Sequence, residues 1–199
     1  MVAGPFYVTV SVILGLSRDG FDFTRHYWSL LENGDLGWVQ MANYVLTGLM
    51  LVAFAVGLGR VLHPGLAHRW APVLVGFFGA SLVVAGSFPA DSYGDFPFDG
   101  FHGTSSRGLL HFAALSFGSA AAAAACFALA RRFAGDGAPG LARFSGVTGV
   151  VALVGLLPFI ATFPGEAANN VRFTAAVVLV FVWIAIVAAH LSRSVNVAA

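Results

Sequence analysis

The sequence predicts an all-α fold in which six transmembrane helices run up and down in one domain. Hydrophobic residues make up 58% of the 199 residues, and the mean hydropathy is +0.84, far above the range of soluble domains. Most of the apolar runs are long enough to cross roughly 30 Å of bilayer hydrocarbon. None shows the polar–apolar alternation of a barrel strand, so backbone groups inside lipid must be satisfied within helices.

The apolar runs fall at six places, and we expect a single integral membrane domain over residues 1–199. The runs cover about 2–17, 37–59, 71–88, 108–130, 144–163 and 173–192. The first run is short, because a helix from Val2 to Leu16 would extend only about 22 Å. It has neither a basic region before it nor a cleavage site after it, so we interpret it as a retained helix and not as a signal peptide.

The segment between the first two runs, DFTRHYWSLLENG, predicts a short helix lying at the membrane interface. Phe23, Tyr27, Leu30 and Leu31 recur at helical spacing, with polar residues elsewhere. Aromatic rings in such a helix would lie at the level of the lipid head groups.

Charged residues are unevenly divided between the two expected sides of the membrane. Six of the ten arginines fall on the side of the two termini, which the positive-inside rule places in the cytoplasm. Eight of the nine acids fall on the other side. The chain has no lysine, which excludes a retinal Schiff base, and its scattered arginines give no stripe for nucleic acid. We therefore expect a protein of the bacterial plasma-membrane type with its chemistry on the extracytoplasmic side.

The connection FPADSYGDFPFDGFHGTSSRGLLH, residues 88–111, is the densest group of titratable side chains. Asp91 follows a Phe-Pro pair at the expected helix end, where a carboxylate is a functional candidate. His111 lies one turn after Arg107, which would place both side chains on one helix face. We expect the other acids on this side to be solvated or paired at the surface: Asp19, Glu32, Asp35 and Asp95.

Two short motifs in this connection resemble those of a known family. They are F-P-x-D, from Phe88 to Asp91, and G-x-x-H, from Gly108 to His111. Together with the segment from Asp22 to Leu31, they make nearly the whole chain resemble the prokaryotic membrane family called domain of unknown function 998. The resemblance implies a six-helix fold and no established activity. His102 and the DFPFDG insertion depart from the family pattern.

Acid/base chemistry on a lipid is the function that we favour for this cluster. A carboxyl group against hydrocarbon resists ionisation, so Asp91 is expected to be the principal acid and His111 its orienter or partner base. Aromatic faces stabilise carbocations, so a proton-initiated cyclisation of an isoprenoid, as in membrane terpene cyclases, would suit the cluster without a cofactor. No D-x-D-D or D-D-x-x-D motif is present. The catalytic candidates are Asp91, His111, Asp99, Asp22 and Glu166, and the substrate-binding candidates are Arg107, Arg172, Arg25, Phe88, Tyr93, Phe112, Phe163 and Trp28.

Two other functions remain open. A zinc-dependent hydrolase of a lipid ester or amide would use His26, His102, His111 and Asp91 as ligands, although no two of these histidines show helical i, i+4 spacing. A non-catalytic lipid-binding or assembly subunit would use its small-residue helix faces to pack against a partner, a homo-oligomer being one option. For His111 itself, a buried ring that only hydrogen-bonds a backbone carbonyl is the structural alternative.

Overall fold

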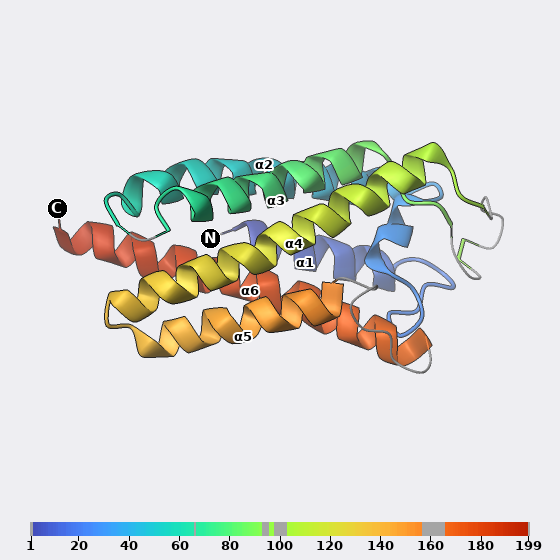
Figure 1. Ribbon diagram of the computed structural model, residues 1–199. Helices are drawn as coiled ribbons and strands as arrows, with labels where there is room; N and C mark the ends of the chain where they lie inside the picture. Colours follow the sequence, from blue (N-terminus) through green and yellow to red (C-terminus); the bar gives the residue numbers. More distant parts are fainter. Residues whose placement is uncertain (1, 66, 93–95, 98–102, 157–165, 199) are drawn as a thin grey trace.

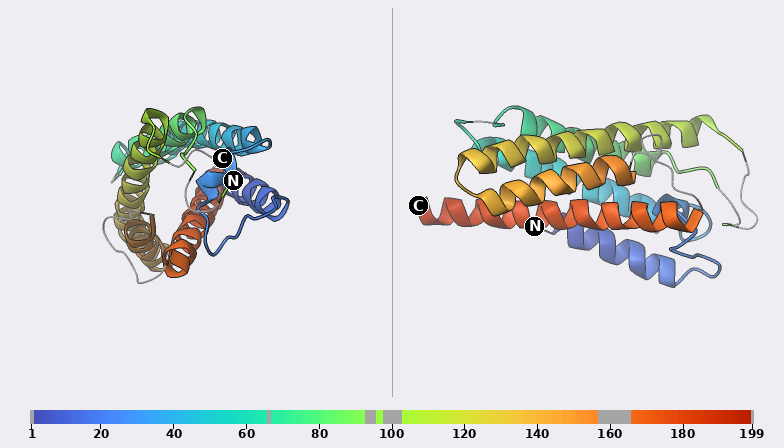
Figure 2. Two further views of the ribbon diagram at one scale, coloured as in Figure 1. Left: turned by 90° about the vertical axis from the view of Figure 1, so that its right-hand side faces the viewer. Right: turned by 60° about the horizontal axis from the view of Figure 1, so that its bottom comes forward.

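The computed structural model describes all residues except 1, 66, 93–95, 98–102, 157–165 and 199 (Figure 1). Each helix packs against the next in chain order, and the first closes a ring against the last. The end-on view in Figure 2 shows this ring. The elements are α1 (Ala3–Leu16), the 3-10 helix η1 (Trp28–Glu32), α2 (Gly37–Val61), α3 (Trp70–Ser87), α4 (Ser106–Gly135), α5 (Pro139–Leu156) and α6 (Glu166–Ala198).

Five of these helices are long and apolar enough to cross a membrane, namely α2, α3, α4, α5 and residues 168–193 of α6. The all-helical, multi-pass prediction is therefore confirmed. Of the six predicted spans, these five are long enough to cross the membrane. The first is not, because α1 has 14 residues and extends about 21 Å. Figure 1 accordingly shows the N-terminus partway along the bundle. The fifth predicted span reached residue 163, and its last part lies outside the described residues.

A buried polar network fixes the short α1 against α2. Asn43 Nδ2 donates to the Tyr7 carbonyl oxygen and to Ser11 Oγ, both at 3.1 Å. Gln40 Nε2 donates to the same Ser11 hydroxyl at 3.1 Å. The side chains of Ser11, Gln40 and Asn43 are at most 1% exposed. Because lipid offers no hydrogen bonds, polar groups at this depth favour pairing between the helices.

The contact between α2 and α3 depends on glycines that let the two backbones touch. A Cβ atom added to Gly48 would lie 2.5 Å from the Gly79 carbonyl oxygen, and one added to Gly79 would lie 2.7 Å from the Gly48 carbonyl oxygen. Neither neighbour is a flexible side chain that could move aside. The close approach of small residues is the usual way for transmembrane helices to gain van der Waals contact.

We expect Gly79→Ala to destabilise the protein by about 1–3 kcal/mol, because the added methyl group forces the two helices apart. Thermal unfolding of the detergent-purified protein measures this loss. Gly57→Ala on the neighbouring helix α2 is the control, since nothing lies within 4 Å of a Cβ added to Gly57. Equal melting temperatures for the two variants would contradict the role of the glycine contact.

The predicted interfacial helix is only partly confirmed. Its helical part is limited to the five residues of η1, four of which are buried. Trp28, Leu30 and Leu31 are 1%, 3% and 0% exposed, and the Trp28 ring stacks on Tyr7 of α1 with 5.9 Å between centroids. Leu30 and Leu31 are buried, as expected for the apolar side of this segment, but they pack against the helix bundle and not against lipid.

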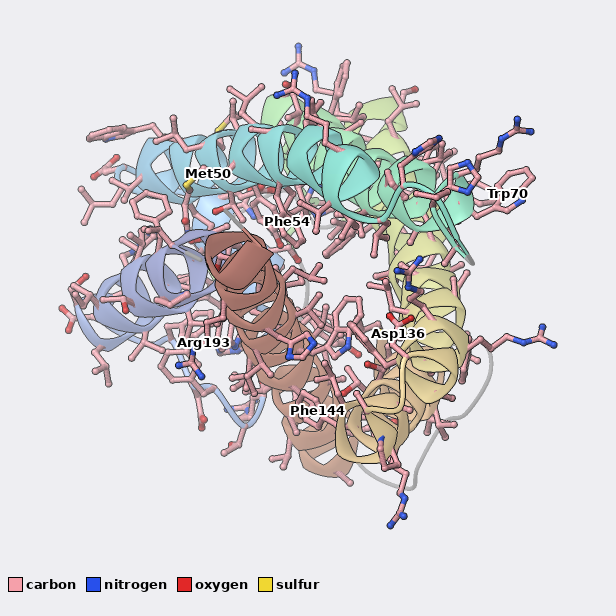
Figure 3. The ribbon with its side chains drawn as sticks, turned by 90° about the vertical axis from the view of Figure 1, so that its left-hand side faces the viewer. Met50, Phe54, Trp70, Asp136, Phe144 and Arg193 are labelled. Carbon is pink, nitrogen blue, oxygen red and sulfur yellow. The ribbon has the colours of Figure 1, made fainter. Side chains whose placement is uncertain are left out.

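The two ends of the bundle carry different groups of connections. The α2–α3 and α4–α5 connections and the C-terminus lie at one end, where Figure 3 shows Asp136 and Arg193. There Arg132 pairs with Asp136 at 2.7 Å and donates to the Leu62 carbonyl oxygen at 3.1 Å. We call the opposite end, which holds η1 and the beginnings of α4 and α6, the η1 end.

Candidate functional site

A carboxyl group and a histidine meet inside the η1 end. His111 Nδ1 lies 3.2 Å from Glu32 Oε2, and the two side chains are 4% and 0% exposed. Glu32 is the last residue of η1, and His111 lies in the second turn of α4. Glu32 Oε2 also accepts a hydrogen bond from the Ala90 backbone N–H at 2.9 Å. The pair therefore joins η1, α4 and the chain that follows α3.

The surroundings of His111 fix its tautomer. Nδ1 lies 3.1 Å from the Ala85 carbonyl oxygen and 3.0 Å from the Phe88 carbonyl oxygen. Carbonyl oxygens only accept hydrogen bonds, so we assign the ring hydrogen to Nδ1. Nε2 is buried and has no hydrogen-bond partner among the residues that the structure describes. In the neutral ring this nitrogen is a base, and no described residue hydrogen-bonds to it.

Burial changes the acidity of Glu32. Removal from water raises the pKa of the Glu32 carboxyl group to about 8, and the hydrogen bond from Ala90 opposes this only in part. Our expectation that Glu32 is a solvated surface acid is therefore wrong. The physical reason is that the apolar side chains just before it, Leu30 and Leu31, pack into the bundle and carry the carboxyl group inside.

His111 lies in the wall of a cavity of about 280 Å³ at the centre of the helix ring. Every helix contributes at least one residue to the wall, and many of these residues are aromatic. The lining residues are Tyr7, Tyr27, Ser29, Tyr44, Phe78, Leu82, His111, Phe112, Leu115, Ser116, Ser119, Gly155, Leu156, Arg172, Phe173, Val177, Val180 and Phe181. Three sequence candidates, namely His111, Phe112 and Arg172, therefore come together at one cavity.

Asp91, our principal acid from the sequence, occupies a different place. Its Oδ2 accepts from the Ser105 backbone N–H at 2.8 Å, and its Oδ1 accepts from the Ser105 hydroxyl at 2.6 Å. Ser105 in turn is the N-cap of α4 and accepts from the Gly108 N–H at 3.0 Å. A Cβ atom on Gly108 would collide with the Asp91 carboxylate. The F-P-x-D and G-x-x-H motifs thus meet as a helix-capping arrangement.

We expect Asp91→Ala to destabilise the protein by about 1–2 kcal/mol, the usual loss when a cap fails. Ser105→Ala should cost a similar amount, and the double variant should cost little more than either, because each change breaks the same arrangement. Thermal unfolding in detergent measures all three, with Asp35→Ala, an exposed acid, as the control. Fully additive losses would contradict the coupling.

Arg107 and Asp91 line a separate open depression outside the cavity, together with residues 33–34, 89–90, 92, 97 and 105–106. Arg107 is exposed, whereas His111 one turn later is buried. The two residues lie one turn apart on α4, but Arg107 lies in the first turn, at the end of the bundle, and does not reach the cavity that His111 lines. Phe88 is 36% exposed and is not part of the cavity wall.

The remaining candidates lie outside the pair and the cavity. Asp22 is exposed, and hydrogen bonds from Thr24 lower its pKa. His26 is buried, accepts from the Asp22 N–H at 3.0 Å and packs on Phe96. Arg25 is exposed, and Trp28 is not one of the lining residues but stacks on Tyr7, which is. Predictions on Tyr93, Asp95, Asp99, His102, Phe163 and the Glu166 side chain lie outside what the structure describes.

No group of three His, Cys, Asp or Glu side chains that could hold a metal ion occurs among the described residues. Of the four zinc ligands considered in the sequence, His102 lies outside that part of the chain. His26 and His111 make separate local contacts, with Asp22 and with the Ala85 and Phe88 carbonyls respectively. The described residues therefore give the zinc site no supporting observation.

The sequence analysis did not select Glu32 or the cavity tyrosines, Tyr7 and Tyr44, as site residues. For Glu32 the sequence nevertheless holds a weak signal. Glu32 directly follows the apolar pair Leu30-Leu31 and lies five residues before Gly37, where an added Cβ atom would collide with the Glu32 carbonyl oxygen. An acid placed between an apolar turn and a tightly packed glycine is a better candidate for burial than one among polar residues.

A ring of apolar helices around a buried carboxyl–histidine pair and an aromatic cavity defines a multi-pass helical membrane protein with an internal polar site. The chain belongs to the family described as protein of unknown function (DUF998), whose model matches residues 1–190. The family resemblance seen in the sequence is thereby confirmed. No curated protein and no solved structure matches the chain.

Proposed function

We propose that the protein is an integral membrane enzyme that transfers protons to and from a lipidic substrate at His111. The observation that supports this most directly is the buried Nε2 of His111, which has no hydrogen-bond partner in the described part of the chain. It lies on a histidine of the cavity wall whose other nitrogen is held by two carbonyl groups and Glu32. A buried base in a fixed orientation is the arrangement that general acid/base catalysis needs.

The proposed step uses one proton in each direction. The His111 ring, protonated at Nε2, gives a proton to one carbon of a substrate double bond, and the neutral ring then removes a proton from another carbon of the resulting carbocation. An isomerisation or a cyclisation of this kind balances without an oxidant, a reductant or a cofactor. Glu32, which replaces Asp91 as the proposed carboxyl partner, would stabilise the imidazolium when it is ionised.

The apolar and aromatic lining of the cavity supports a lipidic substrate. Among lipids, we propose isoprenoids as the substrate class. Aromatic faces of Tyr7, Tyr44 and Phe181 surround the site and would stabilise positive charge on a hydrocarbon chain. Tyr7 and Phe181 are themselves stacked, with 4.7 Å between ring centroids. We also propose that both termini are cytoplasmic and that the η1 end faces outward, because most arginines lie at the other end.

Solvent deuterium tests the proposal. The protein is placed in phosphatidylcholine nanodiscs in D₂O with farnesol, farnesyl phosphate or oleate, and the recovered lipid is analysed by mass spectrometry. We expect deuterium in at least one isoprenoid above the level of empty nanodiscs. Incorporation at the level of empty nanodiscs for all three probes would contradict proton transfer. Binding of a probe without incorporation would favour the second candidate, a lipid-binding subunit that uses the same apolar cavity.

A further inference from the structure

The cavity wall carries hydroxyl groups among its apolar side chains. They come from α1, η1, α2 and α4, and the residues that bear them are Tyr7, Ser29, Tyr44, Ser116 and Ser119. A wall that only holds hydrocarbon gains nothing from hydroxyl groups, because taking them out of water without a hydrogen bond costs free energy. In small-molecule sites, a few polar groups in an apolar wall fix the orientation of the ligand and give specificity.

Ser116 and Ser119 of α4 differ from the helical serines that satisfy their own hydroxyl groups. A serine inside a helix can donate to a carbonyl oxygen about one turn earlier, as Ser81 does to Phe78 at 2.7 Å. Ser116 and Ser119 make no such bond, nor any other hydrogen bond within the described part of the chain. Both line the cavity, and Ser119 is only 7% exposed. Since buried polar groups in native proteins are nearly always hydrogen-bonded, a partner inside the cavity is expected.

These hydroxyl groups lie on the same helix as His111. Ser116 and Ser119 follow His111 by five and eight residues, which places them about 7.5 and 12 Å further along the axis of α4. His111 Nε2 is also buried without a partner among the described residues. One cavity wall therefore presents a base and, deeper in the bundle, two hydroxyl groups that are not engaged by the described protein.

We propose that the ligand of the cavity is a lipid with an oxygen atom within its chain, as a carbonyl or a hydroxyl group, which Ser116 and Ser119 bind. The inference rests on the proposed function in placing the reacting carbons beside His111. A serine hydroxyl donates to either kind of oxygen, and it accepts only from a ligand hydroxyl. The bound oxygen fixes the position of the chain along α4 and so holds one double bond at Nε2.

Water in the empty cavity leads to the same preference. Water molecules can satisfy the two serines when no lipid is bound. A ligand oxygen replaces the hydrogen bonds of such a water, whereas a methylene group displaces the water and leaves the hydroxyl groups without a partner. A chain with an oxygen at this depth should therefore bind more tightly than the plain hydrocarbon.

Three matched probes test the selection. Tridecane, dihexyl ketone and dihexylmethanol have the same chain and differ only at the central carbon. Each is titrated into wild type and Ser116→Ala/Ser119→Ala in phosphatidylcholine nanodiscs, and occupancy is measured by native mass spectrometry. Partition of a probe into the lipid is the same for both proteins and cancels in the comparison.

We expect the double variant to bind at least one of the two oxygen-bearing probes about tenfold more weakly than wild type, with tridecane binding unchanged. Weaker binding of the ketone alone would identify a carbonyl ligand. Weaker binding of dihexylmethanol alone would identify a ligand whose hydroxyl group also donates. Weaker binding of both would identify a site for either kind of oxygen.

Ser81→Ala is the matched control. It removes a buried serine hydroxyl from α3 that is already bonded to the Phe78 carbonyl and does not line the cavity. This variant should bind all three probes as wild type does. Equal binding of both oxygen-bearing probes to wild type and the double variant would overturn the inference. An equal loss for tridecane would also overturn it, because the serines would then act through the shape of the cavity.

The outcomes are separable from those of the proposed function. The three probes contain no carbon–carbon double bond, so their binding requires no proton transfer to the chain. Serine-dependent binding without deuterium incorporation into any isoprenoid would remove the enzyme and leave the oxygen-binding site. Incorporation into an isoprenoid, together with undiminished probe binding by the double variant, would remove this inference and leave the enzyme.

Discussion

His111→Gln is expected to lower deuterium incorporation into the lipid substrate by a factor of about 10²–10⁴, the usual contribution of a general acid/base. Glutamine retains an amide N–H that can donate to the Ala85 and Phe88 carbonyls, the two contacts of Nδ1. It provides no ring nitrogen that accepts and returns a proton. The loss should therefore be in the rate at saturating substrate, with little change in probe binding.

The matched control for this change is His63→Gln. His63 is exposed and lies at the opposite end of the bundle, in the α2–α3 connection. This variant should incorporate deuterium at the wild-type rate. Size-exclusion profiles and melting temperatures establish that both variants are folded. If the His111→Gln protein is folded and still incorporates deuterium at the wild-type rate, Nε2 is not the atom that transfers the proton.

Glu32→Gln is expected to remove much of the pH dependence of stability. The folded-state pKa of Glu32 is about 8, against an ordinary value of 4.5. Below about pH 4.5 the carboxyl group is protonated in both states, so burial costs nothing extra. As the pH rises toward 8, the unfolded chain ionises and the folded chain does not, and stability falls by an amount on the order of 5 kcal/mol. Glutamine does not titrate and keeps an oxygen that can accept from the Ala90 N–H.

Melting temperatures from pH 5 to pH 9 in detergent measure this effect. Wild type and Glu32→Gln should melt at similar temperatures near pH 5, and the variant should be the more stable of the two near pH 9. Asp35→Asn, an exposed acid three residues further along the chain, should follow the wild-type curve. Parallel curves for wild type and Glu32→Gln would mean that Glu32 ionises equally in both states.

The helical architecture could be predicted from composition because bilayer hydrocarbon leaves the backbone few alternatives. Four predicted spans coincide with α2, α3, α4 and α6 to within several residues at each end. The first run shows the limit of this reasoning. Its polar residue Ser11 is an interruption in the sequence, but in the structure it is the contact that joins α1 to Gln40 and Asn43.

The candidate site was predicted in part. His111 and Arg172 were chosen for being titratable or cationic near helix beginnings, and both line the cavity. Asp91 was chosen for the same reason, yet its two oxygens bind Ser105. Sequence spacing cannot separate a carboxylate that caps the next helix from one that faces a cavity, because both follow a helix end closely.

The sequence by itself determined the membrane class, the helical fold, the family and the end of the bundle at which polar groups gather. These follow from composition, run length and short motifs, which are local properties of the chain. Only the tertiary structure decided which acid meets His111. The pairing brings together residues 79 positions apart, and it depends on η1 turning inward so that Leu30, Leu31 and Glu32 are buried together. The free energy of burying the apolar side chains places the carboxyl group beside the histidine, and no local pattern records that contact.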